Sequence, residues 1–339
     1  MKNKTKLFTL IVFFVIPTTI FSQTVESPYE VGIWKGFAKA AVTYTFDDHH
    51  TNQFKIAVPL FDKHGFKLTI YPIPDWNPDW DAIRSAAANG HEIGSHTLSH
   101  PHLDQISLEE QDKELKNSQS TINRELNLEG VNCNTIAYPY CDAGDMGIIG
   151  KYYIAGRICS GQIVPKTPED YYNISSYVCG SLGPINDLAS FEKYLAPVVE
   201  INGWLVLLLH GIDDDGGYSP VTAGFLRETV EYLDVNRRNA WVATFRDAVL
   251  YSKERDAVSV KEIENTAVGI TVEITDNLDN SVYNLPITIR RPLPLEWKGA
   301  TITQNGRPIE SILTQENGNT YILFDAVPDA GNVVIAASS

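Results

Sequence analysis

The run Trp204–Leu209 constrains the fold of this 339-residue chain most, because every side chain in it is apolar. A strand that is apolar on both faces is covered on both faces, as in a parallel sheet flanked by helices. Further runs rich in β-branched residues alternate with helical patterns between about Lys39 and Asp256. The chain is therefore predicted to contain an α/β domain with a parallel sheet or barrel. The other expected strands are Ala41–Phe46, Lys67–Tyr71, Glu92–Ser95, Thr135–Tyr138 and Trp241–Phe245.

Helical patterns lie between these strands. Ser107 precedes the longest pattern and Glu110 completes a capping box with it, while Gly90 marks the end of another. The alternation of strands and helices supports the α/β class. The expected helices cover residues 81–89, 108–126, 223–235 and 246–255.

The hydrophobic period changes after Asp256. Val268, Ile270, Val272 and Ile274 alternate with smaller or polar residues, and clusters of turn-forming residues separate the short runs that follow. Such spacing is typical of a β-sandwich. We therefore expect a main domain at residues 23–257 and a small β-rich, sandwich-like accessory domain at residues 258–339.

Residues 1–22 have the pattern of an export signal. Lys2, Lys4 and Lys6 precede the apolar run Leu7–Ile16, and Ser22 suits a processing site. The run is shorter than the ~20 apolar residues that span a bilayer. We expect cleavage near Ser22, a periplasmic or secreted protein and no membrane span.

The charge of the chain bears on its partners. Lys and Arg total 27 against 42 Asp and Glu, which gives a formal net charge of −15. A field of this sign repels phosphate backbones and anionic lipids, so a nucleic-acid partner is excluded.

The four cysteines lie between Cys133 and Cys179. An exported chain can form disulfides, and four cysteines allow three pairings. Buried free thiols are the alternative, and both readings stay open.

Three polar clusters follow predicted strands. The first places Asp47 and Asp48 at the end of a buried strand, where two adjacent side chains can converge only if the strand gives way to a loop. Loops at strand ends build the sites of α/β folds. A solvated turn with a helix cap is the alternative for this pair.

The second cluster contains His96 and His100, and the third is His210 at the end of the apolar run. Histidines four residues apart can reach a single metal ion from one turn, and a carboxylate would complete three ligands with open positions for water and substrate. A histidine at a strand end is suited to general acid or base catalysis, whereas a satisfied core histidine is the alternative.

Together these segments resemble the signature motifs of the NodB-homology polysaccharide deacetylases, carbohydrate esterase family four. The motifs occur in the family's order and span roughly Lys39 to Arg255. They are Thr45-Phe46-Asp47-Asp48, His96-x-x-x-His100 with Ser99, Tyr138-Pro139-Tyr140 and Leu209-His210.

The resemblance implies a distorted (β/α) barrel with fewer than eight full units. It also implies a divalent metal, zinc in the first place with cobalt or nickel as alternatives, bound by Asp48, His96 and His100. By the same resemblance Asp47 is the catalytic base and His210 the catalytic acid. The backbone N–H of Tyr140 helps to hold the oxyanion, and Tyr138 and Pro139 contact substrate.

The chain departs from the family pattern at several positions. His49 and His50 stand where a glycine usually follows the aspartates; they are extra ligands or solvent-facing loop residues. Ala137 replaces the arginine that normally pairs with the catalytic aspartate, and Arg157 is a candidate to take its place. Asp170 and Asp187 are candidates for the missing carboxylate that orients the catalytic histidine.

A doubled Pro-Asp-Trp sequence contains Trp76 and Trp80. Indole rings pack on the apolar faces of sugars, so both are candidate substrate-binding residues; the alternative is that they pin a long loop. The acidic run Asp213–Asp215 is read as a rim loop, since it lacks the spacing of a calcium loop.

These features predict a metal-dependent hydrolase that removes N-acetyl or O-acetyl groups from a polysaccharide or oligosaccharide. Two alternative functions also fit some of these features. The missing arginine and the appended β domain suit a carbohydrate-binding protein on an inactive scaffold. Two histidines and a carboxylate also describe the facial triad of non-haem iron oxygenases, although that leaves the second aspartate unexplained.

Overall fold

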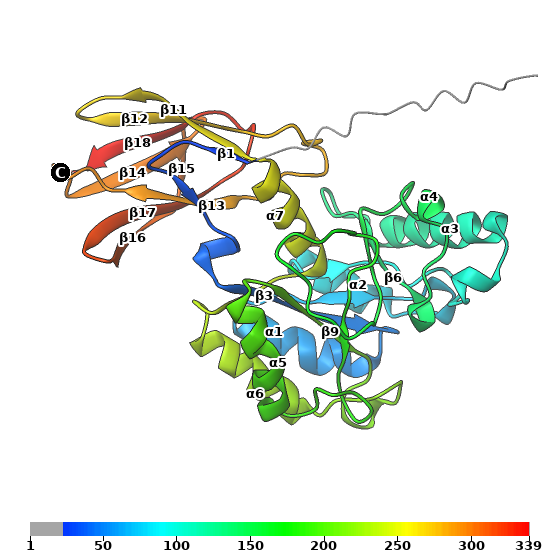
Figure 1. Cartoon of the computed structure of the whole chain (residues 1–339). Coiled ribbons are helices and arrows are strands. Elements are labelled where there is room, and N and C mark those ends of the chain that lie inside the picture. Colours follow the sequence, from blue (N-terminus) through cyan, green and yellow to red (C-terminus); the bar gives the residue numbers. More distant parts are fainter. Residues whose placement is uncertain (1–22, 339) are drawn as a thin grey trace, which may run out of the picture.

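The computed structural model describes residues 23–338 and consists of two parts (Figure 1). We call residues 40–257 the α/β region. The β region comprises the strands of residues 24–31 and 259–338. The export signal predicted at residues 1–22 lies outside the described residues. Within the described part of the chain, no helix combines the length and apolarity needed to cross a membrane.

A parallel sheet forms the centre of the α/β region. Its strand order is β5-β4-β3-β9-β8, every neighbouring pair is parallel, and β10 pairs with the start of β3. All six residues of β9 are buried, as its unbroken apolar sequence predicts. The strands are β3 (Ala40–Asp47), β4 (Thr69–Tyr71), β5 (Glu92–Ile93), β8 (Tyr177–Val178), β9 (Trp204–Leu209) and β10 (Ala240–Val242).

A second parallel pair, β6 (Thr135–Ala137) and β7 (Ala155–Arg157), adjoins this sheet through a single bridge between Ser95 and Ile136. The α/β class is thus as predicted, whereas a closed ring of strands is not shown among the described residues. Strands β7 and β8 are not among the strands predicted from the sequence, because neither Ala-Gly-Arg nor Tyr-Val lies in a run of β-branched residues.

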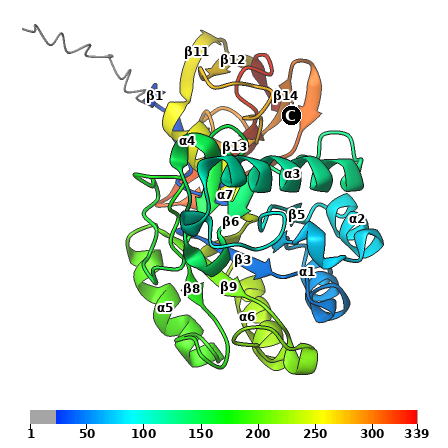
Figure 2. The ribbon, with the colours of Figure 1, turned by 90° about the vertical axis from the view of Figure 1, so that its right-hand side faces the viewer.

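Helices surround the parallel strands (Figure 2). The four predicted helices are confirmed, and Ser107 and Glu110 form the expected capping box. Three others were missed: α4 has one turn, α1 continues a π-helical segment, and α5 contains Pro197. The helices are α1 (Val58–Lys63), α2 (Trp80–Ala88), α3 (Leu108–Leu126), α4 (Met146–Ile149), α5 (Leu188–Glu200), α6 (Ala223–Val235) and α7 (Phe245–Ala257).

The β region contains two sheets, with orders β1-β11-β12-β18-β14-β15 and β16-β17-β13-β2. The alternation read from the sequence is present, since Ile270, Val272 and Ile274 are buried. The strands are β1 (Thr24–Val25), β2 (Glu30–Val31), β11 (Ser259–Asn265), β12 (Gly269–Thr275), β13 (Ile287–Pro292), β14 (Gly299–Gln304), β15 (Arg307–Ile309), β16 (Ser311–Glu316), β17 (Asn319–Ala326) and β18 (Val333–Ser338).

The chain crosses between the two parts more than once. Residues 23–257 were assigned to one domain, yet β1 and β2, at the start of that range, pair with β11 and β13 of the β region. One hydrophobic cluster spans both parts. The ring centroid of Trp34 lies 6.5 Å from that of Trp204 and 6.3 Å from that of Tyr251. Ile289 of the β region belongs to the same cluster. The two parts therefore share a hydrophobic core.

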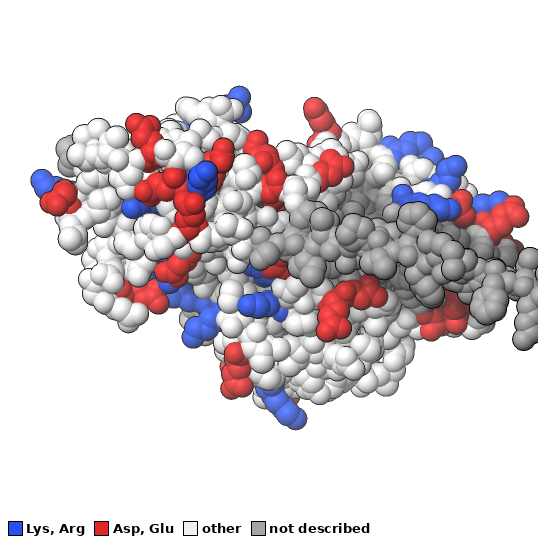
Figure 3. Space-filling model, turned by 45° about the horizontal axis from the view of Figure 1, so that its top comes forward, with Lys and Arg blue, Asp and Glu red and all other residues white. Residues whose placement is uncertain are grey.

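Acidic side chains are spread over both parts on the face shown in Figure 3.

Candidate active site

The two central strands place Asp47 and His210 at one edge of the sheet. Strand β3 ends at Asp47, β9 ends one residue before His210, and Phe46 pairs with Leu209 in the parallel register. The carboxyl ends of parallel neighbours meet at the same edge, which is where α/β folds build their sites. Nε2 of His210 accordingly lies 3.9 Å from Oδ2 of Asp47.

Asp48, His96 and His100 form a group that could hold a metal ion. One ligand atom from each lies within 4.8 Å of the others. Nε2 of His96 is 3.7 Å from Oδ1 of Asp48, and Nε2 of His100 is 4.0 Å from the same oxygen. Nδ1 of His96 makes a 2.8 Å hydrogen bond with the carbonyl oxygen of Ala137, which orients Nε2 toward the group.

These donors fit a divalent cation. Oδ1 of Asp48 is buried and has no hydrogen-bond partner among the described residues, which is a costly state unless something else satisfies it. Two imidazoles and one carboxylate with open positions are the donor set of many catalytic zinc sites. The ligands predicted from the sequence are therefore brought together.

Glu114 of α3 stabilises the loop that carries His100 through hydrogen bonds. Its carboxylate accepts hydrogen bonds from the N–H groups of Leu98 and Ser99 at 2.9 Å and from the Ser99 hydroxyl at 2.7 Å. His100 itself has a φ of 70°, in the left-handed region that L-residues rarely occupy. The Glu114 carboxylate thus stabilises a loop shape that directs His100 toward Asp48.

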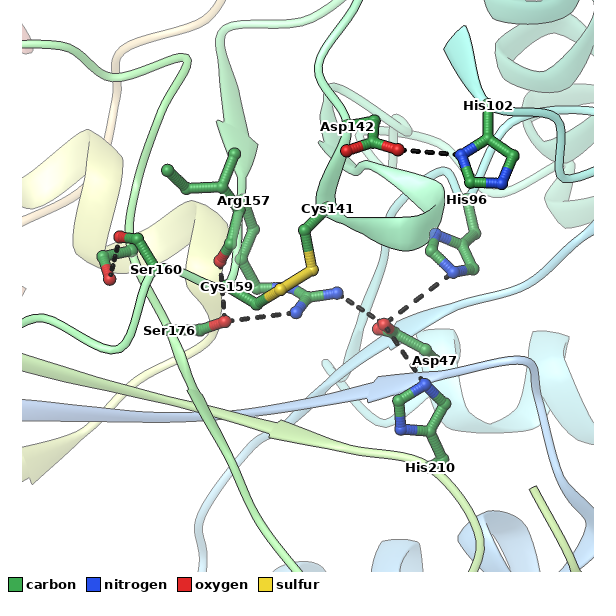
Figure 4. The surroundings of a disulfide bond; sticks show 12 residues. Asp47, His96, His102, Cys141, Asp142, Arg157, Cys159, Ser160, Ser176 and His210 are labelled. Atoms are coloured by element: carbon green, nitrogen blue, oxygen red, sulfur yellow. Dashed lines mark hydrogen bonds and ion pairs between the residues drawn. A yellow bond between two sulfur atoms is a disulfide. The ribbon is translucent and has the colours of Figure 1, made fainter. Parts of the chain in front are cut away.

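Arg157, the candidate for the missing arginine, pairs with Asp47. Its Nη2 donates to Oδ2 of Asp47 at 2.5 Å, and both side chains are buried (Figure 4). Arg157 lies on β7 and is the register partner of Ala137 on β6. Register partners of a parallel pair direct their side chains to the same face. The arginine has therefore been supplied from the neighbouring strand.

The electrostatic surroundings of the site shift the pKa values of the two aspartates in opposite directions. Burial alone would raise the pKa of Asp47, but Arg157, His96 and His210 outweigh it and hold this pKa below its ordinary value. Burial, helped by the charge of Asp47, raises the pKa of Asp48 to about 7. Burial also lowers the pKa of His96 and of His210 to about 4. Asp47 is thus a carboxylate and both imidazoles are neutral at pH 7.

A cavity of about 310 Å³ lies over these groups. Its wall includes Val178 and Leu208 beside the polar residues, and the ring of Tyr218 lies 5.5 Å from that of His210. Tyr138 also lines the cavity, but its hydroxyl is committed to the carbonyl oxygen of Tyr172 at 2.8 Å. The cavity therefore combines titratable groups with a small apolar wall.

Some of the other predicted substrate-binding residues line the cavities, and the rest are packed inside the fold. Trp76 is 51% exposed and lies 5.2 Å from the ring of His100, on the wall of an adjoining hollow of about 530 Å³ that also reaches Asp48. Tyr140 is 55% exposed and lines the central cavity. Trp80 instead packs against the hydrophobic core, and Pro139 is buried beneath the turn. The doubled motif thus supplies one indole to the site rather than two.

Neither carboxylate suggested as the partner of His210 fulfils that role. Asp187 caps α5 by accepting from Ser190, and Asp170 accepts from the N–H of Tyr172. Nδ1 of His210 is buried and has no hydrogen-bond partner among residues 23–338. Both candidates are wrong, because each carboxylate is used by its own local turn.

His49 and His50 lie beside the site without joining the three-residue group. Nδ1 of His49 accepts a hydrogen bond from the N–H of Ile73 at 3.3 Å. Nε2 of His50 lies 3.8 Å from Oδ2 of Asp48, on the side away from His96. Neither histidine faces fully into solvent, since both are partly buried.

Two structural features of the site are not specified by the sequence, a buried glutamine and the choice among the possible disulfide pairings. Nε2 of Gln53 donates to the carbonyl oxygens of Asp47 at 2.6 Å and His210 at 3.0 Å, and so ties the two strand ends together. A disulfide joins Cys141 and Cys159 on the cavity wall, while the other two cysteines are buried thiols. No sequence signal distinguishes a buried glutamine, and four cysteines do not specify their pairing.

Comparison with known proteins shows which family the site-bearing segment resembles. The model of the family described as "Polysaccharide deacetylase" matches residues 35–146, a range that includes Asp47 and the three residues of the proposed metal group. Over these residues the chain matches the polysaccharide deacetylases. The resemblance to the NodB-homology type is confirmed. Arg157, Cys159 and His210 lie beyond the matched range.

Two curated relatives of this chain come from Bacillus. A gellan lyase from a Bacillus species is 31% identical over 330 residues, which cover 90% of this chain and 13% of that protein. A putative polysaccharide deacetylase, YxkH, of Bacillus subtilis is 27% identical over 107 residues, 30% of this chain and 37% of that protein. The chain thus spans only a small part of the length of the first relative.

Solved structures of carbohydrate esterases are also similar. The Xyl-CE4 domain of a xylanase from the hindgut metagenome of Trinervitermes trinervoides has a TM-score of 0.44 at 14% identity, covering 62% of this chain and 89% of that one. A family 4 carbohydrate esterase from Bacillus anthracis has a TM-score of 0.43 at 14% identity, covering 68% and 87%.

Proposed function

We propose that this protein hydrolyses acetyl groups of a polysaccharide or oligosaccharide with the help of a divalent metal, zinc in the first place. One observation carries the proposal: the Asp48–His96–His100 group adjoins a second buried carboxylate, Asp47, that is held by an arginine. The donors suit zinc, and the adjacent carboxylate is placed to accept a proton. A cation bound there would lower the pKa of a water molecule and polarise the acetyl carbonyl.

Asp47 acts as the general base. Its Oδ2 is occupied by Arg157, whereas its Oδ1 is buried without a hydrogen-bond partner in the described part of the chain. The free oxygen can take a proton from water during attack on the acetyl carbon. The arginine keeps the carboxylate ionised at rest and fixes its orientation.

His210 acts as the general acid. Its lowered pKa means that the resting ring is neutral, so the proton that it delivers has to arrive during turnover. The proton that Oδ1 of Asp47 takes during the attack is held beside His210, whose Nε2 lies 3.9 Å from the other oxygen of the same carboxyl group. His210 can therefore pass this proton to the departing sugar amine or alkoxide.

The backbone N–H of Tyr140 and the apolar wall complete the assignment. A backbone N–H beside the cavity can stabilise the oxyanion of the tetrahedral intermediate. Val178 and Leu208 suit the methyl group of an acetyl substituent, and Trp76 offers an exposed ring to a sugar next to it. On this assignment the acetyl group would bind in the deeper cavity and the glycan would lie along the rim.

The binding-protein alternative loses its main reason, since the arginine that Ala137 lacks is supplied by Arg157. No observation favours an oxygenase. We also propose export: the disulfide next to the site is of a kind that persists in oxidising compartments. Because the chain resembles part of a protein named for gellan, gellan belongs among the polysaccharides to be tested.

Released acetate tests the proposal. Purified protein is incubated with acetylated xylan, chitin oligomers, peptidoglycan fragments and gellan. We expect acetate from at least one of them, loss of release after treatment with a chelator, and recovery with zinc or cobalt. A matched variant, Asp48→Asn, should bind less zinc and release little acetate. Absence of acetate from the whole panel, or release that survives complete removal of metal, would refute the proposal.

A further inference from the structure

The Cys141–Cys159 disulfide lies in the wall of the catalytic cavity rather than in a remote loop. Cys141 directly follows Tyr140, and Cys159 lies two residues after Arg157. Figure 4 shows the bridge between the turn that carries Cys141 and the segment that leaves Arg157 toward Ser160. One covalent bond thus connects the neighbourhoods of two residues to which the proposed function assigns roles.

The turn at Tyr140 has an unfavourable backbone. Tyr140 has a φ of 55° and Cys141 a φ of 68°, so two consecutive residues with side chains occupy the left-handed region. Such conformations are rare for L-residues other than glycine, asparagine and aspartate, and they persist where surrounding contacts impose them. The turn therefore needs support from outside itself.

The support comes from few contacts. The N–H groups of Cys141 and Asp142 close the turn on the carbonyl oxygens of Tyr138 and Pro139. The ring of His102 stacks on that of Tyr140 with 3.7 Å between centroids, and its Nδ1 is 2.8 Å from Oδ2 of Asp142. The ring of His100 meets that of Tyr140 edge-on, with 4.7 Å between centroids. Tyr140 is 55% exposed and the side chain of His102 is 39% exposed, so both rings lie partly in solvent. The disulfide is the one covalent support among these.

The other end of the bridge is anchored. Arg157 is buried, and on either side of it Gly156 and Ile158 donate backbone hydrogen bonds to Tyr171 and Ile174. The hydroxyl of Ser176 donates to the carbonyl oxygen of Ile158 at 2.7 Å. Cys159 therefore follows a fixed segment, and the bridge transmits that fixation to the turn.

We infer that the Cys141–Cys159 disulfide is a positioning element of the active site, which holds the Tyr140 turn in the shape that directs its N–H into the cavity. This inference rests on the proposed function, because it gives the Tyr140 N–H a role. Breaking the bridge should lower turnover while the metal group, built from other loops, remains intact.

The double variant Cys141→Ser/Cys159→Ser tests the inference. We expect kcat to fall by about tenfold or more, since loss of an oxyanion donor lowers kcat by roughly 10² to 10³ and a displaced donor loses part of that. KM should change by less than about threefold, and zinc content should match that of the native protein. Zinc content separates this effect from disruption of the metal group.

Chemical reduction provides a second route to the same state if the double variant does not fold. A water-soluble phosphine, with water, reduces the bridge to two thiols and is itself oxidised to the phosphine oxide, and iodoacetamide then caps the thiols. Native protein treated in this way should lose the same share of kcat, whereas the double variant should be unaffected by the phosphine. The control Cys133→Ala, which removes a buried thiol outside the cavity lining, should keep native turnover and native sensitivity.

Amide hydrogen exchange gives a readout that does not depend on activity. The segment Tyr138–Asp142 should exchange faster in the double variant than in native protein, while β9 remains protected. If native protein releases no acetate, the proposed function fails but the exchange result still stands. Unchanged exchange together with a kcat within twofold of the native value would overturn the inference.

Discussion

Three arginines are buried in the described part of the chain, and two of them, one in each part of the molecule, pair with a carboxylate on another strand. Arg157 is 1% exposed and pairs with Asp47 in the α/β region. Arg291 of β13 is 6% exposed and pairs with Glu262 of β11 at 2.7 Å in the β region. The two pairs use the same chemistry but have different surroundings.

The surroundings determine what each pair can do. Glu262 accepts a hydrogen bond from Tyr29 as well, and Tyr29 is itself within 2.9 Å of Arg291, so the charges of this pair are satisfied within the protein. Asp47 keeps one unpartnered oxygen beside a cavity. A buried ion pair alone is therefore weak evidence for a site, and the unsatisfied atom beside a cavity is the informative feature.

The first prediction concerns the largest difference between the pairs. Arg157→Ala should lower kcat by about a hundredfold or more, because it frees the orientation and charge of the proposed base. Arg291→Ala should destabilise the fold by about 3 kcal/mol and leave the kcat of folded protein unchanged. Steady-state kinetics and urea unfolding of both variants measure this. Equal loss of kcat in the two variants would remove the distinction between them.

Restoring an arginine on β6 sharpens this prediction. Ala137→Arg in the Arg157→Ala background directs a new guanidinium to the same face, because residues 137 and 157 are register partners. We expect this double variant to recover at least tenfold of the lost kcat. The single variant Ala137→Arg should be destabilised, because the space is already filled. A folded, zinc-loaded double variant without recovery would show that the effect of Arg157 is not positional.

The second prediction concerns the rim of the cavity, where the expected effect is smaller. Trp76→Ala should raise KM for an oligosaccharide severalfold with little change in kcat, because its half-exposed ring is placed to contact sugar and not the acetyl group. Trp80→Ala is the matched control: it should lower stability and leave KM unchanged, since Trp80 packs on the core. The kinetics of both variants on one acetylated oligosaccharide decide between them.

The sequence predicted the residues of the metal group better than the residues that hold the site in place. Asp48, His96 and His100 stand in order at strand ends, and the topology of a parallel sheet brings such residues together. The partner of Asp47 was suggested only as a candidate, because the register between β6 and β7 depends on pairing across 20 residues of sequence. Gln53 and the disulfide pairing depend on the three-dimensional arrangement alone, and no local pattern specifies them.

The sequence also predicted individual helices and strands better than the pairing of strands between the two parts of the molecule. The capping box at Ser107 and the alternation around Val272 were read directly, because both signals are contained in a few neighbouring residues. The pairing of β1 and β2 with the β region was not foreseen, since two-residue strands carry no pattern of their own. Boundaries drawn from composition therefore miss segments that cross between parts.

The last prediction concerns a buried carboxylate that has no arginine. Glu254 of α7 accepts a hydrogen bond from the N–H of Leu285, while its Oε2 is buried without a partner among the described residues. Burial raises its pKa to about 8. Between its ordinary pKa of 4.5 and 8, the folded protein holds a proton that the unfolded chain releases, so this group lowers stability as pH rises through that window.

The variant Glu254→Gln keeps the hydrogen-bond acceptor and removes the titratable group. Its stability relative to native protein should therefore increase from pH 5 to pH 8.5 by a few kcal/mol, on the order of 1.4 kcal/mol per pH unit, with no change in kcat. Urea unfolding at several pH values measures this difference, and parallel curves for the two proteins would show that Glu254 is ionised in the fold.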